Sequence, residues 1–330
     1  MANPVLSDPR FFSEEAAFEY VEGQLWPEGP TCPHCGALVD KIGRLNGVRS
    51  KPSKKNPEGV VQIGLRKCYA CRGPAFTVRK GTIFEDSHLP LRMWLQAIHL
   101  LCASKKGIST RQLQRMLNCG MKTAWHLGHR IRLAMVDGPD GASMGGIGKT
   151  IEADETYFGK IPRSQTTTSA KGRRIGKTRP ANRAVLALVE RGGRARTFHI
   201  AQADQNTVSR IMRENVAKES RIHTDESAIY NLIQWRFAEH ETVKHSADEY
   251  VRGDVTTNTV EGYFSVFKRG MIGVYQHCDE KHLHRYLAEF DFRYNNRIKL
   301  GVGDAQRSKN ALKGARGKRL TYQTTRGAEA

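Results

Sequence analysis

The chain has 330 residues, and its 53 Lys and Arg against 33 Asp and Glu give a formal net charge of +20 at pH 7. Hydrophobic residues make up 39%, enough for sizeable cores, which excludes a wholly disordered protein. Such a basic balance predicts a polyanionic partner, either nucleic acid or an anionic membrane surface. No uncharged apolar run reaches about 18 residues, and the N-terminus lacks the order of a signal peptide. We therefore expect an intracellular protein that binds nucleic acid and does not associate with a membrane.

The first expected element is a helix within residues 9–27. Phe12, Ala16 and Val21 belong to a set of apolar residues at roughly helical spacing, and Ser13 followed by two glutamates is a typical helix start. We interpret residues 1–31 as a small helical packing segment.

Two Cys-x-x-Cys pairs follow, and they predict a zinc site. Such a pair directs two thiolates to one ion, and two pairs complete a tetrahedron with no open position, as in structural zinc sites. The pairs lie farther apart than the common spacing of about 15–20 residues, because a basic loop at 49–59 separates them. The alternative is a set of unliganded buried thiols. Short strands are expected at Val60–Leu65 and Ala75–Val78, and the expected zinc ligands are Cys32, Cys35, Cys68 and Cys71.

Residues 87–137 are expected to be helical and to bind DNA. The segment 87–136 contains no acidic residue, and a short helix over 109–117, a turn and a second helix from about Lys122 match a helix-turn-helix. The second helix of this motif enters the major groove of DNA. The alternative is a helical packing module with solvated basic faces. The expected DNA contacts are Lys105, Lys106, Arg111, Lys122 and Arg130.

A glycine-rich linker over 138–149 separates the helical part from a mixed α/β domain over 150–300. Residues 301–330 form a basic tail that should not fold alone. A basic stretch at 160–183 is expected to be a DNA-binding loop, with a merely solvated loop as the alternative, and its contacts would be Arg173, Arg174 and Lys177. The expected strands are Thr150–Ala153, Arg183–Val189, Arg196–Ile200 and Arg221–Thr224, and the expected helices are Thr207–Val216 and Leu283–Tyr294.

Three carboxylates in this domain suggest a metal-dependent site. Asp154 and Asp225 each follow a predicted strand, and Glu261 lies in a segment where Lys268 comes two helical turns later. Three converging carboxylates can hold two Mg²⁺ or Mn²⁺ ions that act on a phosphodiester. Lys268 would contact a DNA phosphate, together with Arg269. His223 points to the same strand face as Asp225, and we interpret it as a hydrogen-bonded structural histidine.

These motifs, in this order, resemble bacterial insertion-sequence transposases of the DDE type that carry an N-terminal zinc ribbon, the ISXO-like family. Each stretch is weakly specific alone, but the set spans nearly the whole chain. The stretches that carry the resemblance are Trp26–Cys35, Gly81–Ser87, Ile151–Lys160, His223–Asp225, Asn258–Gly270 and Arg285–Arg297.

The resemblance implies a ribonuclease-H-like catalytic domain over 150–300, preceded by a zinc ribbon over 32–86 and the helix-turn-helix. It maps Asp154 and Asp225 onto the first two metal-binding acids and Lys268 onto the accompanying basic residue. Some members are described with Asn as the third ligand, so Asn258 is the alternative to Glu261. We favour Glu261 because a third carboxylate offsets two dications better than an amide does.

The activity implied is 3′-end cleavage at transposon terminal inverted repeats, followed by strand transfer into target DNA. Two DNA ends must be held together, so a homodimer or a larger assembly on DNA is expected. The location implied is the bacterial cytoplasm, in association with the nucleoid. The alternatives are a transcription regulator that binds DNA without chemistry, a structure-selective nuclease on the same fold that cleaves without joining, and a catalytically decayed copy.

Overall fold

The computed structural model describes residues 4–54, 56–136, 143–159, 183–247, 249 and 251–321. The chain forms two compact units, one from Met1–Gly138 with Gly301–Ala330 and one from Pro139–Leu300. None of the helices in the described ranges is long and apolar enough to cross a membrane. The predicted loop contacts Arg173, Arg174 and Lys177 lie outside the described residues.

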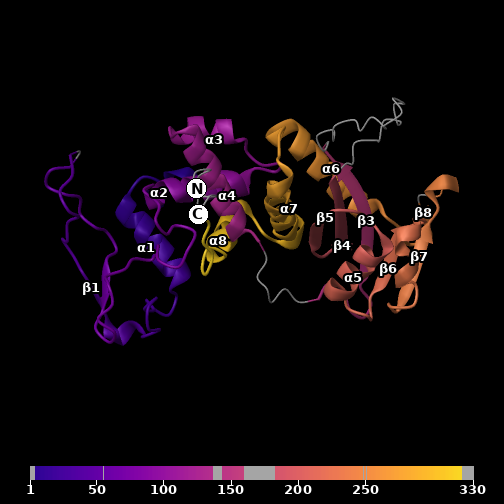
Figure 1. Ribbon diagram of the computed structural model, residues 1–330, viewed down its shortest axis with the longest axis horizontal. Helices are drawn as coiled ribbons and strands as arrows, with labels where there is room; N and C mark the ends of the chain where they lie inside the picture. The colour runs from indigo at the N-terminus through magenta and orange to yellow at the C-terminus, as the bar shows by residue number, and fades with distance from the viewer. Residues whose placement is uncertain are drawn as a thin grey trace, which may run out of the picture. The chain divides into compact units, whose positions relative to one another are not determined.

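The first unit is built mainly from helices. Ser13 caps the first of them by accepting a hydrogen bond from the backbone N–H of Ala16, which confirms the predicted helix start. The helices are α1 (Glu14–Leu25), α2 (Leu91–Ala103), α3 (Thr110–Leu117), α4 (Met121–Ala134) and α8 (Asp304–Lys313), with 3-10 turns at Val5–Ser7, Pro9–Phe11 and Val39–Lys41 (Figure 1).

The α3–α4 pair has the short connection that the sequence predicted. Ser109 caps α3 through the backbone N–H of Gln112, and Asn118 ends the helix in the left-handed conformation with φ 47°. Asn tolerates this conformation better than most residues. Helix α4 begins three residues later, at Met121, so both predicted helices and their turn are confirmed, while their contact with DNA stays a prediction.

The cysteine-rich region contains less strand than expected. Its two strands, β1 (Ile42–Arg44) and β2 (Arg66–Cys68), pair antiparallel. The predicted strand at Val60–Leu65 is wrong, since only Val61 makes an isolated bridge, to Arg49. The predicted strand at Ala75–Val78 is likewise reduced to a bridge between Phe76 and Arg66. Val60 and Val61 are exposed, whereas Phe76 is buried beside the cysteine cluster, so neither segment joins a longer sheet.

The C-terminal segment folds with the N-terminal unit. Helix α8 lies against α2, with Ala311 and Leu312 fully buried, and Arg307 donates a hydrogen bond to the carbonyl of Cys102. The four predicted segments 1–31, 32–86, 87–137 and 301–330 therefore belong to one compact unit. The described part of the predicted tail is structured because its apolar face is covered by helices from the other end of the chain.

The second unit is organised around a mixed five-stranded sheet with the order β5-β4-β3-β6-β7. Strand β4 runs antiparallel to both β3 and β5, whereas β6 is parallel to β3 and to β7. The strands are β3 (Thr150–Phe158), β4 (Arg183–Glu190), β5 (Ala195–Ile200), β6 (Arg221–Asp225) and β7 (Glu239–Val243), and a separate hairpin joins β8 (Val251–Arg252) to β9 (Val255–Thr256).

Helices cover both faces of this sheet (Figure 1). Leu186 and Leu188 of β4 pack on one face with Val208 and Met212 of α5 (Gln205–Asn215). The alternate residues of β4 pack on the other face with α6 (Asn258–Gly270) and α7 (Glu280–Asn295), as alternation along a strand requires. The remaining short segments are 3-10 turns at Ala228–Ile233, His245–Ala247 and Ile298–Leu300 and a π turn at Met271–Tyr275.

The linker predicted at 138–149 is partly integrated into this unit. Met144 is buried in the hydrophobic core between the sheet and α5, and its backbone forms hydrogen bonds with Asn215 and Ala217. Residues 143–149 therefore belong to the sheet domain, and residues 138–142 lie outside the described residues.

Candidate active site

The four predicted zinc ligands lie together in the first unit. The Sγ atoms of Cys32 and Cys71 are 3.8 Å apart, and those of Cys35 and Cys68 are 3.7 Å apart. All four ligand atoms lie within 4.8 Å of one another. A tetrahedron with Zn–S bonds of about 2.3 Å has S···S edges of about 3.8 Å. The thiols therefore have the spacing that a zinc ion requires, and His34 is not needed as a ligand.

Backbone geometry supports this arrangement of the thiols. The N–H of His34 donates to the Sγ of Cys32, and the N–H of Gly73 donates to the Sγ of Cys71, each at 3.4 Å. Gly36 follows Cys35 with φ 74°, a conformation that favours glycine. These turns hold both Cys-x-x-Cys segments open toward a common centre.

Asp154 and Asp225 come from neighbouring parallel strands of the second unit. The register pairs Thr150 with Arg221 and Glu152 with His223, and both strands continue from there toward the two aspartates. Strand β6 ends at Asp225 as expected, but β3 continues to Phe158 alongside β4. The expectation that Asp154 ends its strand is therefore wrong, because β4 extends the pairing on that side.

The surroundings of Asp154 disfavour its charge. Burial, and then the negative charges of Glu155, Asp225 and Glu261, together raise the pKa of Asp154 to about 7. Such an environment is unfavourable for an isolated carboxylate and favourable for one that binds a cation. Asp154 therefore lies within electrostatic reach of the other two predicted ligands.

Glu261 lies on the first turn of α6. Its carboxylate accepts a hydrogen bond of 2.8 Å from the hydroxyl of Thr257, which is buried. Asn258 is the first residue of the helix, and its backbone N–H donates to the Thr256 hydroxyl. Glu261, Asn258 and Lys268 are all exposed, so each side chain is accessible to a ligand.

Carboxylate oxygens are the donors that Mg²⁺ and Mn²⁺ prefer, so the donor set of Asp154, Asp225 and Glu261 fits such an ion. Among the described residues, the cysteine cluster is the group of three or more potential ligands whose atoms gather within 4.8 Å. The oxygens of the three acids therefore do not gather within that distance of one another.

Glu155 faces the opposite side of the sheet from Asp154, as the alternation of β3 predicts. Its carboxylate accepts a hydrogen bond of 2.9 Å from the hydroxyl of Tyr230, which is buried. Burial and the charge of Asp225 raise the pKa of Glu155. Glu226 likewise turns to a separate partner, the backbone N–H of Ser246.

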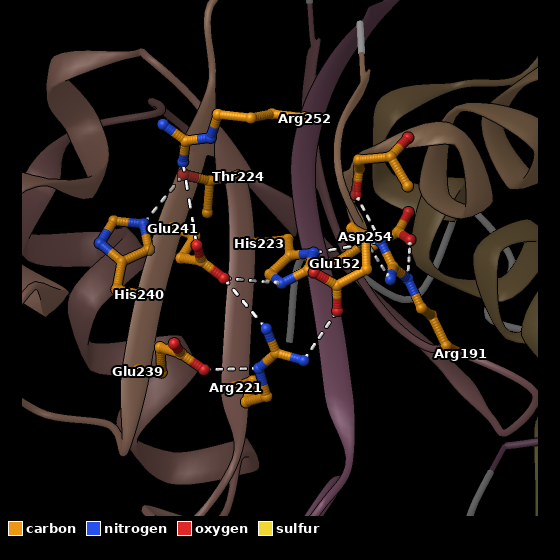
Figure 2. Close-up of polar contacts among 11 residues, drawn as sticks. Glu152, Arg191, Arg221, His223, Thr224, Glu239, His240, Glu241, Arg252 and Asp254 are labelled. Atoms are coloured by element: carbon orange, nitrogen blue, oxygen red, sulfur yellow. Dashed lines mark hydrogen bonds and ion pairs between the residues drawn. The ribbon is translucent and has the colours of Figure 1, made fainter.

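A polar network that the sequence analysis missed connects this sheet to α6. Glu152 is fully buried and accepts hydrogen bonds from the backbone N–H groups of Thr259 and Val260 at 2.7 and 3.0 Å. It also forms an ion pair of 2.6 Å with Arg191. Figure 2 shows this pair beside His223. The sequence offered one signal for this network: Glu152 lies two residues before Asp154, and alternation along a strand places both on the same face.

His223 is a buried structural histidine, as predicted. Its Nδ1 lies 3.0 Å from a guanidinium nitrogen of Arg191, and burial together with the charges of Arg191 and Arg221 lowers its pKa. Arg221 also pairs with three acids around the edge of the sheet, Glu239, Glu241 and Asp254 (Figure 2). This cluster fixes β7 and the β8–β9 hairpin.

The predicted DNA contacts divide into exposed and buried residues. Lys105, Lys106, Arg111 and Lys122 of the first unit are exposed, as are Lys268 and Arg269 of α6. Arg130 is only 6% exposed. Its guanidinium donates to the carbonyl of Glu85 and lies over the ring of Trp94 at 5.2 Å. The prediction that Arg130 contacts DNA is therefore wrong, because the face of α4 that carries Arg130 packs into the core.

Comparison with known proteins gives two matches to families. Residues 145–295 match the ISXO2-like transposase domain, and residues 12–73 match the transposase zinc-ribbon domain. A protein of the transposable element ISH50 from Halobacterium salinarum, described as uncharacterized, is 27% identical over 300 residues. The alignment covers 86% of this chain and 91% of that protein. The region matched to the transposase domain contains the three carboxylates, and the region matched to the zinc-ribbon domain contains the cysteine cluster.

Proposed function

This chain belongs to the insertion-sequence transposases that have a zinc ribbon and an ISXO2-like transposase domain, and we propose that it moves DNA by cleavage and strand transfer. In this proposal the protein binds the terminal inverted repeats of a transposon, hydrolyses the phosphodiester at each 3′ end, and joins the freed 3′-hydroxyl to target DNA. The observation that carries the proposal is the placement of the three acids. Asp154 and Asp225 lie on the paired parallel strands β3 and β6, and Glu261 lies in the first turn of α6, whose backbone N–H groups bond to Glu152 of β3.

The sheet topology supports a ribonuclease-H-like assignment for the second unit. The first strand, β3, is central, the second strand is the one that runs antiparallel, and the last two strands, β6 and β7, extend the sheet on the other side. This arrangement brings Asp154 and Asp225 onto adjacent strands. Helix α6 then supplies the third acid from the face that it covers.

Asp154, Asp225 and Glu261 would hold the Mg²⁺ or Mn²⁺ ions. When bound, such ions lower the pKa of an attacking water or hydroxyl and stabilise the leaving oxygen of the phosphodiester. Thr257 orients Glu261 through its hydroxyl. Lys268 lies two turns farther along the same helix face, where its ammonium would bind a DNA phosphate and position the strand.

The first unit would recognise the DNA ends. Its exposed Lys105, Lys106, Arg111 and Lys122 can neutralise phosphates, and the α3–α4 pair has the element lengths of a helix-turn-helix. A structural zinc ion in the four-cysteine cluster would stabilise the ribbon. Since both transposon ends must be joined in one event, we propose that the protein acts as a homodimer or larger assembly on DNA.

The test is a strand-transfer assay with the zinc-loaded full chain. Labelled DNA with the terminal repeats of the element is incubated with a plasmid target and Mg²⁺, using wild-type protein and Asp225→Asn. We expect joined products with wild-type protein and none with the variant, while both bind the labelled DNA equally. Arg236→Gln, a change of the second unit outside the carboxylate site, is the control and should join normally.

The other outcomes separate the alternatives. Metal-dependent cleavage without any joined product would contradict strand transfer and favour a nuclease. Tight, specific binding with no cleavage under Mg²⁺ or Mn²⁺ would contradict catalysis and favour a regulator or a decayed copy.

A further inference from the structure

Glu152 occupies an unusual position for a carboxylate in a sheet. It is fully buried, yet each of its oxygens is hydrogen-bonded. Oε2 accepts from the N–H groups of Thr259 and Val260, and Oε1 accepts from the Thr259 hydroxyl at 2.8 Å and from Arg191. The residue before α6, Thr257, makes no side-chain cap. Glu152 therefore takes the capping role for a helix that lies more than a hundred residues away in sequence.

Arg191 holds this cap in place. Besides the ion pair with Glu152, its guanidinium donates to the backbone carbonyls of Asp254 and Thr256 at 2.7 and 3.0 Å. Those carbonyls belong to the hairpin that leads directly into α6. One arginine thus fixes both the capping carboxylate and the chain that enters the helix, so the start of α6 has little freedom to shift against β3.

We propose that Glu152, held by Arg191, is a positioning residue that sets the separation between Asp154 and Glu261. This inference rests on the proposed metal-dependent function of those two acids. Asp154 lies two residues after Glu152 on the same face of β3. Glu261 directly follows Val260, whose backbone N–H donates to Glu152. One side chain therefore connects the strand that carries the first acid to the helix turn that carries the third.

The charge of Glu152 suits this role as well as its shape does. The N-terminus of a helix carries partial positive charge and unsatisfied N–H groups, which favour a carboxylate. A carboxylate bonded to two N–H groups and a guanidinium is held in one rotamer, since any rotation would leave buried donors without acceptors. Gln at this position would keep one acceptor oxygen and lose the ion pair.

The chain provides a matched control in its other unit. Glu14 accepts hydrogen bonds from the backbone N–H groups of Leu91 and Arg92 at the start of α2 and pairs with Arg79. It performs the same capping chemistry as Glu152, in a unit that contains none of the three metal-site acids. Glu14→Gln therefore measures what loss of such a cap does to stability alone.

The experiment measures Mn²⁺ binding to the zinc-loaded full chain by titration calorimetry, together with the thermal midpoint and the strand-transfer rate. The proteins are wild type, Glu152→Gln, Glu14→Gln and Asp154→Asn, the last defining loss of the site. We expect Glu152→Gln to weaken Mn²⁺ binding and strand transfer by about 10- to 100-fold, the usual effect of removing an outer-shell partner. Glu14→Gln should lower the thermal midpoint and bind Mn²⁺ as the wild type does.

Wild-type Mn²⁺ affinity in Glu152→Gln, with a thermal midpoint lowered as in Glu14→Gln, would overturn the proposal and leave Glu152 a purely structural cap. If Glu152→Gln does not fold, Arg191→Lys decides by the same criterion. A wild-type protein that binds Mn²⁺ but joins no DNA would contradict the proposed function, while the Mn²⁺ affinities would still decide the role of Glu152.

Discussion

Asp154 combines burial with repulsion from neighbouring acids, and the two effects raise its pKa from 3.8 to about 7. In the metal-free protein this is a cost of folding at neutral pH. Between about pH 4 and pH 7, the folded state keeps a proton on Asp154 that the unfolded state has released. The contribution of Asp154 to the free energy of unfolding is therefore complete below about pH 4 and is lost as the pH rises through 7. A bound dication would remove the cost by pairing with the charge.

Asp154→Asn should therefore stabilise the metal-free second unit above pH 7 and have little effect near pH 4. The expected gain is a rise in thermal midpoint of about 2–4 °C for each kcal/mol recovered. Calorimetry at pH 4 and pH 8 in buffer without Mg²⁺ measures it, and a chelator must be avoided because it would remove zinc.

Asp204 provides a control of opposite sign. Hydrogen bonds from Thr207 lower the pKa of Asp204, so its contribution to stability is present at neutral pH and is lost as the pH falls through its folded pKa. Asp204→Ala should lower the thermal midpoint at pH 8. A lower midpoint for Asp154→Asn at pH 8 would contradict the electrostatic cost at that residue.

Residue-level prediction from sequence succeeded where local pattern determines the result. The four cysteines gather as their spacing indicates, and Asp225 ends its strand as expected. Arg130 was assigned to DNA because the segment lacks acids, but its contact with Trp94 depends on how α4 packs. Glu152 was missed because its partners on α6 are distant in sequence, and no local pattern indicates a cap supplied from another element.

At the scale of elements, the cysteine cluster must stabilise a region that has little other structure. Among the described residues of this region, strand pairing is limited to β1, β2 and isolated bridges, and the apolar residues packed around the cluster are few. We therefore expect the folding of this region to depend on a zinc ion in the cysteine cluster.

Cys68→Ser should reduce the zinc content from one ion per chain to none and make the segment 32–73 sensitive to protease. The second unit should melt at its wild-type temperature, since it contains none of the ligands. Metal analysis and limited proteolysis measure both effects. Cys278→Ser changes a thiol outside the cluster and should keep its zinc, and a full complement of zinc in Cys68→Ser would be inconsistent with a four-cysteine site.

Two differences between the predicted and the observed strands have physical reasons. Strand β7 reads Glu-His-Glu-Thr-Val, which looks like a surface loop because it is charged. It forms an edge strand beside β6, where charged residues are common and protect against pairing with other chains. Arg221 satisfies Glu239 and Glu241 across the pair. The predicted strand at 60–65 failed for the converse reason, since Val60 and Val61 are apolar but exposed.

At the scale of the whole molecule, the first unit is closed by its C-terminal helix. Helix α8 packs on α2 and buries Leu312 at 1% exposure. The sequence predicted that this segment would not fold alone, and it could not show that the partner lies near the opposite end of the chain, because hydrophobic periodicity identifies an apolar face without identifying what covers it.

Leu312→Ala should destabilise the first unit by about 2–5 kcal/mol, as for other buried leucines replaced by alanine. The thermal transition of the second unit should stay unchanged, because that unit has its own core. Calorimetry of the full chain measures both transitions. Lys313→Ala, a change at the adjacent exposed residue, should have almost no effect, and equal stability of Leu312→Ala and wild type would argue against a packed α8.

The central claim is that three acids, the third of them Glu261, form the site of strand transfer. The most direct measurement compares joined products formed by Glu261→Gln and Asn258→Ala, with binding of the repeat-end DNA measured in parallel. We expect Glu261→Gln to bind DNA normally and to lose more activity than the about 10- to 100-fold that an outer-shell change costs, while Asn258→Ala still joins. Retained joining by Glu261→Gln, with joining lost in Asn258→Ala, would contradict the claim and assign the third position to Asn258.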